Sequence, residues 1–95
     1  MKILHIILSE GFAGSEKYTV DLINFQSEKY TCYLIKNKNN KSKDIYAKLT
    51  KNTKIFEINN FLKIFLINFI IHKIKPDIVH THLGKSGQFI LKRNF

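Results

Sequence analysis

The sequence predicts a single α/β domain, in which a parallel sheet of about four strands is flanked by helices. Three observations predict it. Short runs rich in Ile, Leu and Val alternate with helix-like segments, and glycine-containing loops follow the first and the last of these runs. The chain has 95 residues, of which 44% are hydrophobic, so it is one domain at most and too apolar for disorder. Alternating elements of this kind imply parallel strands joined by right-handed crossovers.

The first strand and the first helix are expected on either side of a glycine-containing loop. Residues 2–8 are a short run rich in Ile and Leu, and the loop spans residues 10–14. Ser15 offers a side-chain oxygen as helix N-cap, and Glu16 puts negative charge in the first turn, where the helix dipole favours it. The helix is expected over 16–27. Its apolar residues share one face: Tyr18, Leu22 and Phe25, with Ile23 adjacent.

The remaining elements continue the alternation. In chain order they are a strand over 30–35, a solvated loop over 36–43, a short helix over 44–51, a strand over 53–58, a helix over 61–74, a strand over 77–82 and the start of a helix over 88–92. Pro76 ends the helix before it, because the residue that precedes a proline is pushed out of the helical region. The helix over 61–74 is apolar nearly all round, so it is either deeply packed or covered by something absent.

Both glycine loops should lie at one edge of the sheet, because parallel strands end at the same edge and ligands bind outside it. The first loop opens a helix, which suits an anion, although an ordinary tight turn explains it equally well. It is not a dinucleotide fingerprint, since Ala13 and Glu16 stand where that pattern needs glycines. Residues 84–86 (GKS) match only the tail of a P-loop, because Val79 stands where its first glycine belongs.

The histidines are the other candidate site residues. His80 and His82 are two apart on one strand and share a face, but no third ligand lies near them in the sequence, so we expect no metal site. His82, at the end of the strand, is better placed to meet a ligand, and His80 is expected to be structural. His5 should be buried and hydrogen-bonded, and His72 should lie on the surface or at a helix end.

Charge and cysteine content limit the function classes further. The net charge is +9, carried by 15 lysines and one arginine. This favours anionic surfaces over sequence-specific nucleic-acid recognition, which relies on arginine. A lone cysteine, Cys32, excludes an internal disulfide and is expected to be buried and inert. No apolar run reaches the roughly 20 residues of a membrane span, so we expect a soluble cytoplasmic protein, with peripheral contact at the inner face of the membrane left open.

Three segments together resemble the start of a glycosyltransferase of family 4, which has the two-domain GT-B fold. They are MKILHI at 1–6, GFAGSE at 11–16 leading to DL at 21–22, and KPDIVHTH at 75–82. The last is fairly specific, since Pro-Asp, the strand and both histidines come in order. The first loop is looser, because Ala13 stands for the first of the family's paired glycines and Ser15 for its alanine. The likeness runs through nearly all of the chain.

The resemblance implies a partial N-terminal, Rossmann-like domain over 1–95 that holds the acceptor, such as a lipid-linked or envelope saccharide. The nucleotide-sugar would be bound by a C-terminal half that this sequence does not contain, and transfer would retain anomeric configuration without metal or cofactor. Substrate-binding positions carried over from the family are Gly11, Gly14, Ser15, Glu16, His82 and Gly84. No catalytic residue is assigned.

The resulting hypothesis is a glycosyltransferase fragment that is inactive alone, because the donor-binding domain is missing. Two alternatives stay open: a small basic module that binds anionic membrane surfaces or nucleic acid, and a subunit that a separately encoded partner completes.

Overall fold

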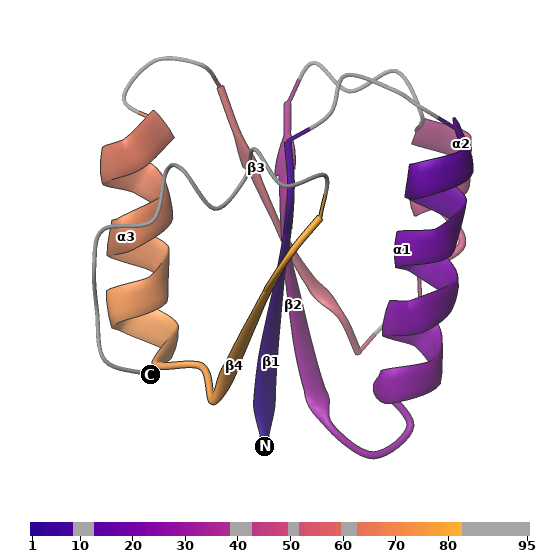
Figure 1. Ribbon diagram of the computed structural model, residues 1–95, viewed down its shortest axis with the longest axis horizontal. Coiled ribbons are helices and arrows are strands. Elements are labelled where there is room, and N and C mark those ends of the chain that lie inside the picture. The colour runs from indigo at the N-terminus through magenta and orange to yellow at the C-terminus, as the bar shows by residue number, and fades with distance from the viewer. Residues whose placement is uncertain (9–12, 39–42, 50–51, 60–62, 83–95) are drawn as a thin grey trace.

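The described strands and helices alternate along the chain, as the sequence predicts (Figure 1). The computed structural model describes residues 1–8, 13–38, 43–49, 52–59 and 63–82. The elements are β1 (Lys2–Ile7), α1 (Ala13–Gln26), β2 (Thr31–Asn37), α2 (Lys43–Tyr46), β3 (Lys54–Ile58), α3 (Lys63–Ile74) and β4 (Ile78–Thr81). The loop expected over 83–87 and the helix expected over 88–92 lie outside the described residues. None of the described helices is long and apolar enough to cross a membrane.

The described strands form one parallel sheet in the order β3-β2-β1-β4. The chain moves outward from β1 through β2 to β3, then returns to place β4 on the other side of β1. The order therefore matches the first four strands of the doubly wound 3-2-1-4-5-6 arrangement, whose winding reverses between the first and fourth strands. This confirms the predicted Rossmann-like α/β class.

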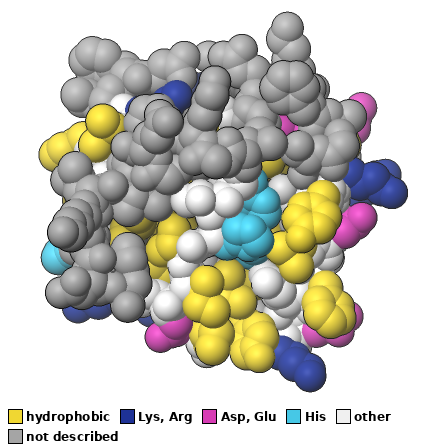
Figure 2. Space-filling view, in the orientation of Figure 1, with side chains coloured by type: hydrophobic (Ala, Val, Ile, Leu, Met, Phe, Trp, Pro, Cys, Tyr) yellow, Lys and Arg dark blue, Asp and Glu magenta, His cyan; other side chains and the backbone are white. Residues whose placement is uncertain are grey.

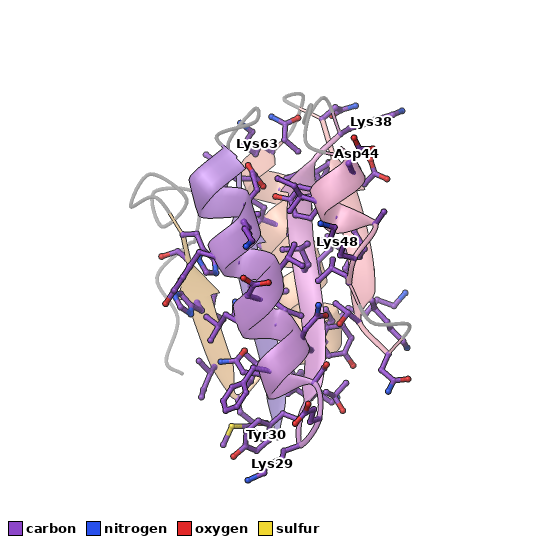
Figure 3. The ribbon with its side chains drawn as sticks, turned by 90° about the vertical axis from the view of Figure 1, so that its right-hand side faces the viewer. Lys29, Tyr30, Lys38, Asp44, Lys48 and Lys63 are labelled. Atoms are coloured by element: carbon purple, nitrogen blue, oxygen red, sulfur yellow. The ribbon has the colours of Figure 1, made fainter. Side chains whose placement is uncertain are left out.

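Helices cover both faces of the sheet, with α3 on one side and α1 and α2 on the other (Figures 1 and 3). Successive residues of β1 point to opposite faces, so Leu4 and Ile6 pack toward α3, while Ile3 and Ile7 pack toward α1. The buried helix residues of the two clusters are Ile67, Ile71 and Ile74 of α3 on one face, and Val20 and Ile23 of α1 with Tyr46 of α2 on the other. Burial on both faces explains why β1 reads as a continuous apolar run.

A set of hydrogen bonds fastens the turn between α3 and β4 to the start of β1. The Lys2 backbone N–H donates to Asp77 Oδ2 at 2.7 Å, and the Asp77 backbone N–H donates to the Lys2 carbonyl at 2.8 Å. Lys2 Nζ donates to the Ile74 carbonyl at 3.1 Å, at the C-terminus of α3. Lys75 ends that helix with a φ of 55°, the left-handed conformation common at helix ends. The helix therefore ends where the Pro76 rule predicts.

The first helix begins earlier than predicted. It starts at Ala13, so Gly14 and Ser15 lie in its first turn instead of in a loop, and Ser15 is not the N-cap. Alanine is the strongest helix former, which favours extension of the helix in the N-terminal direction.

The second strand also extends beyond the predicted limit, which corrects the expectation of a solvated loop from residue 36. Lys36 and Asn37 are buried at the end of β2. Lys36 Nζ lies 3.5 Å from Glu57 Oε2 on β3 and 5.0 Å from the centre of the Tyr46 ring. A carboxylate and an aromatic face thus receive the ammonium group, which allows the lysine stem to pack inside.

The packing between α3 and the sheet leads to a stability prediction. Ile67→Ala removes a fully buried side chain and should lower the free energy of unfolding by about 2–5 kcal/mol, since a cavity remains. Phe65→Ala, two residues away and on the exposed side of the same helix, removes a side chain that is 65% exposed and should change the free energy of unfolding by no more than about 0.5 kcal/mol. Urea denaturation measures both, and equal losses would contradict the assigned packing.

Candidate functional site

Three histidines from two neighbouring strands gather on the face of the sheet that α1 covers. His5 in β1 pairs directly with His80 in β4, and His82, two residues further, shares their face. The His80 and His82 rings stack with their centroids 4.1 Å apart and their planes 14° apart. One ring nitrogen from each of the three lies within 4.8 Å of the others. Histidine side chains are visible in the middle of the face shown in Figure 2, beside hydrophobic side chains.

Hydrogen bonds connect two of these histidines to α1. His5 Nε2 lies 2.6 Å from Gln26 Oε1, an acceptor, so this nitrogen carries the proton. In a neutral imidazole His5 Nδ1 is then an acceptor, and His82 Nε2, 3.0 Å away, donates to it. The remaining His82 nitrogen, Nδ1, lies 3.4 Å from Thr19 Oγ1 and can accept the hydroxyl proton. The four side chains thus form a head-to-tail chain of donors and acceptors.

Burial keeps the connected histidines neutral. Desolvation, together with the nearby His80 and His5, lowers the pKa of His82 from 6.5 to about 4. Desolvation also lowers the pKa of His5; the hydrogen bond to Gln26 opposes that shift, and His80 adds to it. A proton on either ring would place a positive charge in a buried, poorly solvated position, so both rings are uncharged at neutral pH.

The face of α1 that meets the histidines is polar, which corrects the predicted apolar face. Tyr18 and Phe25 are 61% and 74% exposed. The buried residues of the helix are Glu16, Thr19, Val20 and Ile23, and Gln26 continues this stripe toward His5. Thr19 and Gln26 are tolerated there because ring nitrogens of His82 and His5 supply their hydrogen-bond partners.

The site lies directly below the edge at which β1 and β4 end. Ile6 and Thr81 are paired near the ends of their strands, and the His82 backbone N–H donates to the Ile6 carbonyl at 2.9 Å. The two strands therefore end at the same edge, as predicted, and residues 9–12 and 83–87 after them lie outside the described residues. That edge is also the point where the winding of the sheet reverses, and ligands of open α/β sheets bind at such a point.

The sequence-predicted site residues fall into two groups. Gly11 and Gly84 lie outside the described residues. Gly14 and Ser15 lie in the first turn of α1, Glu16 is fully buried there, and His82 is buried in the histidine cluster.

The three residues that join His82 are His5, Thr19 and Gln26, and sequence reasoning missed them as site residues. His5 supplies a third imidazole beside His80 and His82, where no neighbouring position of the sequence offers a third ligand. A polar residue inside an otherwise apolar strand, and polar residues spaced by seven along a helix, were the available signals.

Two side chains behave as the sequence predicts outside this cluster. Cys32 is fully buried, and desolvation raises the pKa of its thiol, so it stays an unreactive thiol at neutral pH. His72 is exposed in the last turn of α3. Inside the cluster, His5 is buried and hydrogen-bonded, also as expected.

Comparison with known proteins gives one match. The sequence model of a family described as "Glycosyl transferase 4-like" matches residues 6–93, which is nearly the whole chain. Neither a curated protein nor a solved structure matches the chain significantly.

The lowered histidine pKa values predict acid instability. In the unfolded chain these rings take up a proton near pH 6.5, whereas folded His82 does so only near pH 4. The contribution of His82 to stability is therefore complete above about pH 6.5 and is lost as pH falls toward 4, and the lowered pKa of His5 acts in the same direction. The slope should approach about 1.4 kcal/mol per pH unit for each proton taken up only on unfolding. Urea denaturation from pH 7.5 to 4.5, with a chelator present, measures it.

Two variants make this prediction specific. His82→Gln should flatten the dependence of the unfolding free energy on pH, because one of the depressed groups is gone. His72→Gln, at an exposed position, should leave the dependence as in the wild type. Equal flattening by both variants would show that the cluster does not cause the acid sensitivity.

Proposed function

The chain belongs to the glycosyl transferase 4-like family, and on that premise we propose that it forms the acceptor-side, N-terminal part of a glycosyltransferase with two-domain GT-B architecture. The complete enzyme would transfer a sugar from a nucleotide-sugar to an acceptor, with retention of anomeric configuration and without a metal in the reaction. Residues 1–95 would supply one wall of the cleft between the two domains, and a donor-binding domain would supply the other.

The observation that carries this proposal is the position of β1 and β4. They are parallel neighbours at the winding reversal of the sheet, and both strands end at the same edge. In doubly wound sheets this is where the ligand lies. Gly11, Gly14, Ser15 and Glu16 after β1, with His82 and Gly84 after β4, are the residues we propose to line the acceptor side.

The size of the sheet supports a partial domain. The described residues supply four strands, and the doubly wound arrangement that they match has about six. β4 stands at the edge of the described sheet, next to the position that a fifth strand occupies in that arrangement. The nucleotide-sugar site would lie on a second domain outside residues 1–95, so we propose that residues 1–95 alone do not catalyse transfer.

A direct assay tests the proposal. The purified chain is incubated with labelled UDP-glucose, UDP-N-acetylglucosamine or GDP-mannose and a panel of saccharide and polyprenyl-phosphate acceptors. We expect no transfer by residues 1–95 alone, because in the proposed architecture they supply only the acceptor side. Transfer should appear when a GT-B donor-binding domain is added. Efficient transfer without a second polypeptide would refute the partial-domain proposal.

A second candidate role is contact with an anionic membrane surface, through one face of α3. Ile64, Phe65 and Phe69 are exposed on this helix, and Lys63 and Lys73 lie at its two ends. Large apolar side chains next to lysines suit the interface of an anionic bilayer, and the net charge of +9 adds long-range attraction. The acceptor of the first proposal would then be lipid-linked.

Vesicle sedimentation tests this second role. The chain should bind vesicles that contain phosphatidylglycerol at low salt and release them as salt rises, since each lysine near the surface contributes about 1 kcal/mol. Phe65→Ser combined with Phe69→Ser should abolish binding, while Phe25→Ser, exposed on the opposite layer, should leave it unchanged. Equal binding to duplex DNA, insensitive to the two α3 substitutions, would point instead to unspecific charge attraction.

A further inference from the structure

We propose that His5, His80 and His82 form a binding site for a divalent transition-metal ion, with Zn²⁺ as the representative occupant. The site goes beyond the proposed sugar transfer. It shares His82 with the acceptor positions proposed above, and its other two ligands, His5 and His80, lie on the face of the sheet that α1 covers. It rests on the geometry of three side chains that β1 and β4 bring together.

The separation of the ring nitrogens fits a shared ion. Two nitrogens bound to tetrahedral Zn²⁺ at about 2.0–2.1 Å lie about 3.3 Å apart. His5 Nδ1 and His82 Nε2 are 3.0 Å apart, with a single proton between them, so an ion can replace that proton after a small opening of the pair. The third nitrogen, from His80, lies within 4.8 Å of the others. His80 is the most exposed of the three and can turn toward the ion.

The outer nitrogens of two of the ligands already have oriented partners. Metal-bound histidines usually donate the other ring N–H to an oxygen, which fixes the ring and its tautomer. Here His5 Nε2 lies 2.6 Å from Gln26 Oε1, and His82 Nδ1 lies 3.4 Å from Thr19 Oγ1. Both oxygens come from α1. On metal binding, His82 gives up the proton on Nε2 and carries one on Nδ1, which then donates to Thr19 Oγ1. Thr19 therefore changes from donor to acceptor, which a hydroxyl can do, and Gln26 keeps its role.

The donor set indicates the class of ion. Imidazole nitrogens suit Zn²⁺, Co²⁺, Ni²⁺ and Cu²⁺, whereas Mg²⁺ and Ca²⁺ prefer oxygen ligands. Three protein ligands leave a fourth position for water or another small ligand. An ion there would cross-link β1 to β4 directly under the edge where their loops begin, so its proposed effect is to hold the sheet at the reversal point, outside the chemistry of transfer.

Cobalt and zinc binding to the full chain test the site. The chelator-treated protein is titrated with Co²⁺ at pH 7.5. We expect the visible absorption of tetrahedral cobalt, saturating at one ion per chain and displaced by Zn²⁺. Zn²⁺ at one hundred times its Kd should raise the Tm by about 10 °C or more. Absence of stoichiometric binding in the wild type would overturn the proposal.

Three variants separate this site from unspecific histidine binding. His80→Phe keeps a ring stacked on His82 but has no ligand atom, and it should weaken Co²⁺ binding by more than about 100-fold. Gln26→Leu should weaken it by about 10–100-fold through the lost partner of His5. His72→Phe, the exposed control on α3, should bind as the wild type does. Unchanged affinity in both site variants, or an equal loss in the control, would refute the assignment, and circular dichroism confirms that each variant is folded.

Discussion

The pairing of β1 with β4 is the constraint on which the rest of the site depends. Asp77 accepts a hydrogen bond from the Lys2 backbone and returns one to the Lys2 carbonyl, and this fixes which residues of the two strands face each other. At the other end of the strand pair, the His82 backbone N–H donates to the Ile6 carbonyl. Within this register His5 stands opposite His80. A shift of one residue would send His80 and His82 to the other face of the sheet, among the apolar residues that pack on α3.

This constraint gives the Lys-Pro-Asp segment a physical role. Pro76 ends α3, Lys75 takes the left-handed conformation that turns the chain, and Asp77 anchors the turn to β1. The segment lies at the opposite edge of the sheet from the proposed acceptor cleft. Its contribution to function is thus through alignment, because it sets the positions of residues at the far end of the same short strand.

The polar layer between α1 and the sheet is the costly part of this fold. Burying imidazole, amide and hydroxyl groups is unfavourable unless each finds a partner, and the chain from Thr19 through His82 and His5 to Gln26 provides those partners. An apolar filling would be simpler to stabilise. These polar groups lie under the edge where β1 and β4 end. The proposed acceptor side and the proposed metal site both depend on this position, and separate experiments test them.

The sequence by itself determined the class of fold and the order of the elements, because alternating apolar runs, helix-like spacing and Pro76 are local signals that each segment carries within itself. It also indicated the edge where the loops meet, since that follows from parallel strands. It did not determine the face that α1 buries. Tyr18, Leu22 and Phe25 have helical spacing, yet the stripe containing Thr19 and Ile23 faces the sheet.

Only the tertiary structure decided the membership of the histidine cluster. His5 and His82 are 77 residues apart in the chain, and their contact depends on strand order and register, which no short segment encodes. The same applies to Lys36, whose burial depends on Glu57 from the neighbouring strand and on Tyr46 from α2. Local patterns predict whether a segment forms a helix or a strand, whereas long-range packing determines which residues contact a buried polar group.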